Sequence, residues 1–145
     1  MKVDFHSGVA DKLVAACRFL RKAHDAGATV VVCADRATLD RLDVALWTFE
    51  ALSFVAHARW KAATAPGAAM SLTPIWLADD ARAIDARDLL LNLGPEMVDG
   101  WEHFERVVEI VSAEPEDASA GRQRWRQYSA RPGLELVHHA KTAGT

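Results

Sequence analysis

The sequence predicts one α/β domain, built as a three-layer sandwich around a mostly parallel central sheet. Segments with the apolar composition of buried strands alternate with segments of helical periodicity, beginning with strand, helix, strand and helix. This alternation is typical of parallel sheets with helices on their faces. The chain has 145 residues, half of them apolar, which is enough for one domain with a sizeable core. We expect the domain to span residues 1–139 and residues 140–145 to form a flexible tail.

The first half of the chain predicts two pairs of a strand and a helix. Residues 2–6 are expected to form the first strand, and Ser7 is expected to cap the helix after it. Gly27 suits the left-handed residue that ends such a helix. Residues 29–33 are mostly apolar and β-branched, which favours a strand buried on both faces of a parallel sheet. Asp35 is then placed to cap a second helix.

The second helix has more apolar side chains than a single contact can bury. One stripe with the spacing of a core-facing helix surface consists of Leu39, Leu42, Leu46 and Phe49. Trp47 projects about 120° from the middle of that stripe and Val44 nearly opposite it, at about 100° of rotation per residue. Phe54 follows in a segment too short to be an independent element. Either a small subsidiary core forms here, or a partner protein covers these side chains.

The second half of the chain predicts further strands and one long helix. Residues 59–73 are rich in alanine, and we expect them to form a surface loop. The helix is expected to start near Pro115, which suits its first turn, and to run to about Ala130. Buried strands are expected at residues 74–77, 88–93 and 106–111, and an edge strand at residues 134–137.

Composition and charge exclude several classes of function. The net charge of -3, with histidine neutral, argues against a generally basic protein that coats nucleic acid. The sequence has neither the pattern of a signal peptide nor an apolar run near the ~20 residues of a membrane span. Cys17 and Cys33 lie among apolar residues without metal-ligand spacing, which indicates buried, reduced thiols. We therefore expect a soluble, cytoplasmic protein that does not bind a membrane.

The sequence lacks the motifs of phosphate, metal and acid–base chemistry. The glycine-rich loops that bind phosphate in many α/β sheets are missing after the first two strands, at residues 6–8 and 34–36. The histidines are scattered, and His138 and His139 would point to opposite sides of a strand. Three loop carboxylates near arginines are expected to be solvated surface charge, namely Asp79, Asp80 and Asp85. We therefore expect no catalytic residue, no cofactor and no metal ion.

The last helix contains the most informative cluster of side chains. Arg122, Trp125 and Arg126 have the spacing i, i+3 and i+4, so two guanidinium groups flank one aromatic ring on one face. In one interpretation the arginines complement the helix dipole and Trp125 belongs to the core. In another, the guanidinium groups bind carboxylates while an adjacent apolar pocket accepts a hydrophobic side chain. Nucleic acid could use the same groups, through phosphate pairing and base stacking.

Four parts of the sequence together match a known family. They are residues 3–6 with residues 11–13, residues 41–47, residues 53–57, and Arg124-Trp125 with Tyr128 after an apolar strand. With these segments the sequence resembles the chi subunit of the bacterial DNA polymerase III holoenzyme, a component associated with the clamp loader. The resemblance extends over nearly the whole chain. It implies a Rossmann-like fold and a non-catalytic adaptor in DNA replication.

In this family the adaptor bridges two partners. One is the psi subunit, which links chi to the clamp loader, and the resemblance implies that Trp47 and Phe54 face it. The other is the acidic C-terminal tail of single-stranded-DNA-binding protein, so that contact with DNA is indirect. The resemblance places the pocket for this tail at Val111, Arg122, Trp125 and Arg126.

Two positions depart from the pattern of the family. Trp125 stands where a tyrosine is expected, and Ala118 stands where a lysine is expected, about one turn before Arg122. The tail pocket would then be less basic, unless another arginine substitutes. Two alternatives belong to other classes of function. One is a nucleotide-dependent enzyme of the same architecture, which rests on fold analogy alone, and the other is a direct nucleic-acid-binding module formed by the final helix.

Overall fold

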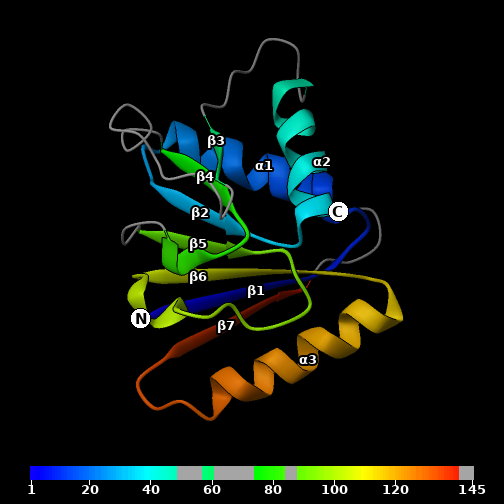
Figure 1. Ribbon diagram of the computed structural model, residues 1–145. Coiled ribbons are helices and arrows are strands. Elements are labelled where there is room, and N and C mark those ends of the chain that lie inside the picture. Colours follow the sequence, from blue (N-terminus) through cyan, green and yellow to red (C-terminus); the bar gives the residue numbers. More distant parts are fainter. Residues whose placement is uncertain (49–56, 61–73, 84–87, 141–145) are drawn as a thin grey trace.

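A seven-stranded sheet runs through the computed structural model, which describes residues 1–48, 57–60, 74–83 and 88–140 (Figure 1). The strands are β1 (Lys2–Val9), β2 (Val30–Cys33), β3 (Ala58–Trp60), β4 (Ile75–Ala78), β5 (Leu89–Asn92), β6 (Arg106–Ser112) and β7 (Glu135–Ala140). The helices are α1 (Lys12–Asp25), α2 (Arg36–Thr48) and α3 (Pro115–Ser129), with short 3-10 helices η2 (Ala81–Ala83) and η3 (Trp101–His103).

The strands lie in the order β3-β4-β2-β5-β6-β1-β7, and every neighbouring pair is parallel. Helices α1 and α2 cover one face of the sheet, and α3 lies across the other (Figure 1). Helices on both faces of a parallel sheet make a Rossmann-like sandwich. The predicted fold class is therefore confirmed.

The connection from β1 to α1 differs from the sequence prediction. Ser7 does not cap α1, because β1 continues to Val9 and Ser7 lies within the strand, paired with β7. The cap is Asp11, whose carboxylate accepts hydrogen bonds from two N–H groups of the first helical turn at 2.9 and 3.2 Å. Val9 is buried in the core beneath α1, which explains why the strand extends further before the chain turns. Gly27 follows α1 with a φ of 77°, as predicted.

Strand β3 corrects the start of the predicted loop at residues 59–73. Residues 59 and 60 belong to this strand and pair with Leu77 and Ala78 of β4. Pairing along a sheet edge uses backbone groups and does not require a typical strand composition, so the sequence pattern does not reveal β3. Residues 61–73 lie outside the described part of the chain.

The sheet separates two apolar cores. The core beneath α1 and α2 includes Ala16, Cys17, Leu20, Leu39, Leu42 and Leu46. The core beneath α3 includes Val3, Phe5, Cys33, Trp76, Trp101 and Tyr128. Both cysteines are free and buried, as predicted, and burial raises the pKa of Cys17 to about 11 and of Cys33 to about 12. Both thiols are therefore protonated at neutral pH.

The last strand reaches the predicted end of the domain. Strand β7 pairs with β1 at the edge of the sheet, where an edge strand was expected, and ends at Ala140. The tail residues 141–145 lie outside the described part, so the boundary at residue 139 stays a prediction. Of the helices that the structure describes, none is long and apolar enough to cross a membrane.

Candidate functional site

A cavity of about 400 Å³ opens beside α3, at the C-terminal ends of β1 and β6. Its apolar wall includes Phe5, Val111, Ala118, Gly121 and Trp125. Its polar side chains are Ser7, Ser112, Arg122 and His138. A mostly apolar cavity with a few polar groups is the usual form of a site that binds a small ligand or the side chain of a peptide.

The close approach of α3 to β6 depends on Gly121. A Cβ atom at this position would lie 2.8 Å from Cγ2 and 2.9 Å from Cγ1 of Val111. Those distances are shorter than ordinary van der Waals contacts, so only glycine fits without a shift of the helix or the strand. Gly121 therefore sets the depth of the cavity between α3 and β6.

Trp125 belongs partly to the core and partly to the cavity wall. Its half-buried ring packs edge-on against Phe5 of β1, with 5.2 Å between ring centroids. On its other side it contacts His138 of β7, with 5.8 Å between centroids. Both interpretations of this residue from the sequence are thus compatible with its position, because the ring packs on the sheet and still faces the cavity.

Three of the four residues predicted for the tail pocket line this one cavity. Val111, Arg122 and Trp125 are among the lining residues, whereas Arg126 is exposed on α3 and is not among them. The guanidinium group of Arg122 is exposed at the cavity and can bind a carboxylate there. Ala118 also lines the cavity and contributes no charge.

Sequence reasoning missed the lining residues that the sheet contributes. The pairing of β1 with β7 places Phe5 beside His138, and the Oγ atom of Ser7 lies 2.5 Å from Nε2 of His138. The alternation of side chains along a strand does predict that Leu136 and His138 share a face. It does not reveal that the first and last strands of the chain are neighbours.

The two adjacent histidines of β7 lie on opposite faces of the sheet, as predicted. His138 faces the cavity beneath α3, whereas His139 stacks on His6 on the other face, with 4.6 Å between ring centroids. His139 also forms a hydrogen bond with the buried carboxylate of Asp4 at 3.1 Å. Within the described ranges, no group of three or more potential metal-binding side chains lies together.

The loop carboxylates after β4 are paired with arginines. Asp79 lies 3.0 Å from the guanidinium group of Arg36, and Asp80 lies 3.1 Å from that of Arg82. The hydrogen bond from Arg82 lowers the pKa of Asp80, so this group is ionised at neutral pH. Asp85, the third of these predicted surface charges, lies outside the described residues.

A second surface lies on α2, where apolar side chains face solvent. Trp47 is 57% exposed and Val44 is 65% exposed, as expected for side chains that the core beneath α2 cannot bury. The Trp47 ring contacts the ring of His57, with 4.8 Å between centroids, and His57 in turn binds Asp43 at 2.7 Å. Phe54, the other predicted residue of this surface, lies outside the described part of the chain.

Comparison with known proteins identifies the family to which this chain belongs. A family model described as DNA polymerase III chi subunit, HolC, matches residues 1–136. The chain belongs to the DNA polymerase III chi subunit family. A protein of Pseudomonas aeruginosa named DNA polymerase III subunit chi is 32% identical over 143 residues, which cover 95% of each chain. The family resemblance is therefore confirmed, and the chain is placed among the accessory subunits of DNA replication.

A solved structure supports the fold of this chi-family chain. A chain from the Saccharomyces cerevisiae assembly of Dbp5 with Nup159, Gle1, IP6 and ADP superposes with a TM-score of 0.59 and 8% sequence identity. The match covers 97% of this chain and 42% of the other. At so low an identity the similarity concerns the α/β fold alone.

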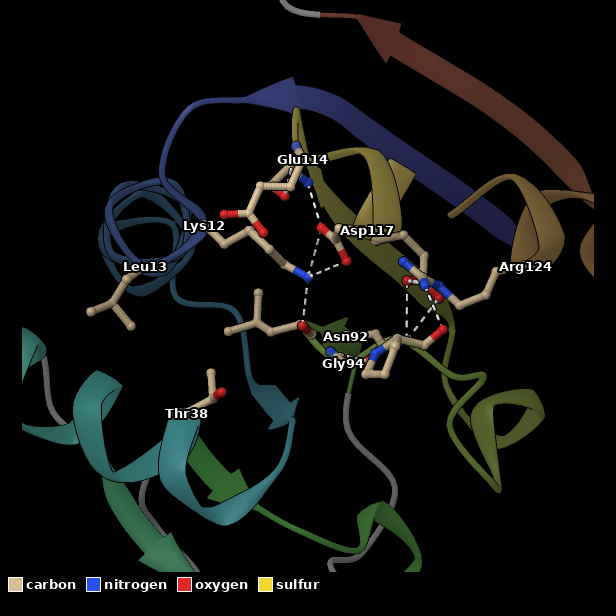
Figure 2. A network of polar contacts seen from close by, with 12 residues as sticks. Lys12, Leu13, Thr38, Asn92, Gly94, Glu114, Asp117 and Arg124 are labelled. Atoms are coloured by element: carbon tan, nitrogen blue, oxygen red, sulfur yellow. Dashed lines mark hydrogen bonds and ion pairs between the residues drawn. The ribbon is translucent and has the colours of Figure 1, made fainter. Parts of the chain in front are cut away.

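A buried polar network joins α3 to the sheet of this chi-family protein. Glu109 of β6 accepts hydrogen bonds from Nε of Arg124 and the hydroxyl of Tyr128, both at 2.9 Å, and from the amide of Asn92 at 3.1 Å. Figure 2 shows Asn92 and Arg124 of this network. Burial raises the pKa of the Glu109 carboxyl, and the charge of Arg124 opposes that shift. A single glutamate between the apolar residues of a strand was the sequence signal for this network. The network fixes the rotation of α3 and so directs its other face toward the cavity.

Side chains of the protein itself form a polar network in the region where many doubly wound sheets bind nucleotides (Figure 2). Lys12 donates to the carbonyl of Leu93 at 2.6 Å and forms an ion pair with Asp117 at 3.2 Å. Burial alone would raise the pKa of Asp117, but the N–H group of Ser112 and the charge of Lys12 outweigh it and lower that pKa. A cavity of about 610 Å³ lies here, lined by the carboxylates of Asp11, Glu114, Glu116 and Asp117 and the cations of Lys12 and Arg41.

Proposed function

We propose that this chain is a non-catalytic accessory subunit in the cytoplasm. In this proposal it links the clamp loader, through the psi subunit, to the acidic C-terminal tail of single-stranded-DNA-binding protein. The observation that supports the proposal most is that Val111, Arg122 and Trp125 line one cavity, whereas the exposed Trp47 lies on a different helix. Contact with DNA is then indirect.

The cavity beside α3 suits a peptide that ends in an apolar residue with carboxylates next to it. A side chain of the size of phenylalanine, buried against Val111 and Trp125, contributes about 1.5–3 kcal/mol. A charge-assisted hydrogen bond from Arg122 contributes about the same. Both contributions are needed, because binding immobilises a flexible tail and costs conformational entropy. Arg126, exposed on the same helix, is expected to meet acidic residues that precede the end of the peptide.

The exposed surface of α2 suits the psi subunit. Exposed tryptophan and valine side chains on one helix are typical of a protein interface, and tryptophan is among the residues that contribute most to binding. The contact with His57, itself bound to Asp43, holds the ring of Trp47 in place before a partner arrives. We include Phe54 as a second aromatic contact for psi on the basis of the family resemblance.

The two surfaces lie near opposite edges of the sheet. Helix α2 contacts β3 and β4, whereas α3 contacts β6 and β1 (Figure 1). At about 4.8 Å between neighbouring strands, the outermost strands of a seven-stranded sheet are about 29 Å apart. This separation supports simultaneous binding of two partners.

Three observations favour a binding role over nucleotide hydrolysis or direct binding of nucleic acid. The N-terminus of α1, where phosphate binds in nucleotide-dependent sheets, is already capped by the carboxylate of Asp11. The cavity in front of it has more carboxylates than cations, which disfavours a phosphate ligand. The pocket beside α3 offers one guanidinium group, that of Arg122, in a single cavity, whereas single-stranded DNA requires an extended positive track with a series of stacking rings.

Titration calorimetry tests the tail pocket, using a synthetic peptide that ends in acidic residues followed by phenylalanine. We expect Arg122→Ala to weaken binding at least tenfold, about 1.4 kcal/mol or more, and to reduce its salt dependence. Arg18→Ala, an exposed arginine on α1, is the matched control and should leave the affinity unchanged. Equal affinities for the wild type and Arg122→Ala would remove the pocket from this function.

A binding assay with purified psi tests the surface of α2. Truncation of an aromatic side chain at the centre of an interface costs about 2 kcal/mol or more, so Trp47→Ala should weaken psi binding about thirtyfold. The thermal stability should hardly change, because Trp47 is mostly exposed. Val14→Ala, which truncates an exposed apolar side chain on α1, is the control. Unchanged psi binding by Trp47→Ala, with lowered stability, would contradict the proposal.

A further inference from the structure

We propose that His138 is a second cationic contact for the acidic tail, so that the pocket binds its peptide more tightly as the pH falls toward about 6. This inference rests on the proposed function of the cavity beside α3. It assigns to this chain a pH-dependent binding group that comes from the edge strand β7 rather than from the helix.

The geometry leaves one nitrogen of the imidazole available to a ligand. His138 is exposed, lines the cavity and packs edge-on against Trp125, one of the residues of the apolar wall. Its Nε2 atom is hydrogen-bonded to the hydroxyl of Ser7. Across the described residues, Nδ1 of His138 has no hydrogen-bond partner. A carboxylate at the mouth of the cavity can therefore accept a hydrogen bond from Nδ1 without displacing Ser7.

Protonation makes His138 a better ligand for a carboxylate. A neutral imidazole has one N–H group, whereas an imidazolium has two and a positive charge. In the charged form Nε2–H donates to the Ser7 hydroxyl, and Nδ1–H is free to donate to the peptide. Charge-assisted hydrogen bonds are about twice as strong as neutral ones. Because the bound carboxylate favours the protonated ring, binding strengthens as the pH falls, and the peptide carboxylates stay ionised down to about pH 6.

Apart from Arg122, the ionisable groups near His138 do not line the cavity. Arg122 is the other charged residue among the described residues that line the cavity, and it keeps its charge throughout. Strand β1 contributes Phe5 and Ser7 to this face, and the end of β6 contributes Ser112. Asp4, His6 and His139 point to the opposite face of the sheet, where His139 contacts both His6 and Asp4. Glu109 of β6 is on the face of α3 but does not line the cavity, and its buried carboxyl group is bonded to Arg124, Tyr128 and Asn92.

Titration calorimetry tests the inference with the full chain and a synthetic peptide that ends in acidic residues followed by phenylalanine. The affinity is measured at about pH 6 and at about pH 8, at the same ionic strength. The wild type should bind about fivefold more tightly at the lower pH. In His138→Gln the affinities at the two values of pH should be equal. His139→Gln changes the adjacent residue on the opposite face and should keep it. His138→Lys, which places a permanent cation at the same position, should bind tightly at both values of pH.

The outcomes separate the inference from the function on which it rests. A wild-type ratio near one, or an unchanged ratio in His138→Gln, overturns the role of His138. If Arg122→Ala still weakens binding in that case, the proposed tail pocket stands and only the inference falls. Absence of peptide binding to the wild type at both values of pH removes both. Thermal unfolding of each variant shows that the comparison concerns folded protein.

Discussion

The close approach of Gly121 to Val111 predicts that Gly121→Ala destabilises the wild-type protein but stabilises a variant in which residue 111 is alanine. Alanine is about 1 kcal/mol more favourable than glycine in a helix interior. Here the added Cβ would lie 2.8 and 2.9 Å from the two methyl groups of Val111, and overpacking of this kind costs about 1–3 kcal/mol. We therefore expect Gly121→Ala alone to lower the free energy of unfolding by about 1 kcal/mol.

Removing the two methyl groups removes the clash. In a Val111→Ala background the new Cβ would have its nearest contact with the Cβ of residue 111, at 3.4 Å, which is an ordinary contact. In that background Gly121→Ala should raise the free energy of unfolding by about 1 kcal/mol, which gives a coupling energy of about 2 kcal/mol. Urea unfolding of the four proteins, followed by circular dichroism, measures this cycle. A stabilising effect of equal size in both backgrounds would show that α3 does not approach β6 so closely.

Two further predictions concern charged groups beneath and beside α3. Arg124→Met leaves the buried Glu109 without its cation and should lower the free energy of unfolding by about 3–5 kcal/mol. Arg126→Met, on the exposed side of α3, is the control and should change that free energy little. Urea unfolding measures both. Burial alone would raise the pKa of Asp4, but the hydrogen bonds from His139 and Arg106 and the charge of Arg106 outweigh it and lower that pKa. Its stabilising contribution should therefore be lost as the pH falls below about 4, and Arg106→Gln should flatten this acid dependence of unfolding.

The sequence predicted the layers of the fold because hydrophobic periodicity reports which face of an element is buried. The stripe of Leu39, Leu42 and Leu46 identified the core-facing side of α2. The same geometry placed Trp47 outside that stripe but left open whether a subsidiary core buries it, and in the structure it is exposed. The prediction that Ser7 caps α1 was wrong, because Ser7 and Asp11 are both residue types that cap helices well. Only the burial of Val9, a tertiary contact, decides where the strand ends.

The site was predictable only in the part that one helix contributes. Arg122 and Trp125 share a helix face, so their spacing is sufficient to bring them together. His138 reaches the same cavity through strand pairing, and no local pattern specifies which strand will lie beside β1. Glu109 and Arg124 show the same limit, because a buried ion pair between a strand and a helix depends on their docking.

The cavity beside α3 is lined by both β1 and β7, which are far apart in the sequence, so its assembly depends on the order in which these strands are synthesised. Ser7 and His138 are 131 residues apart in sequence, yet they form one hydrogen bond at the cavity. During translation β1 emerges first, and its outer edge stays unpaired until β7 has left the ribosome. A chain that stops before β7 still contains all of α2 but lacks one wall of the cavity. The cavity is therefore complete only after β7 has paired with β1, whereas all residues of α2 precede β7 in the sequence.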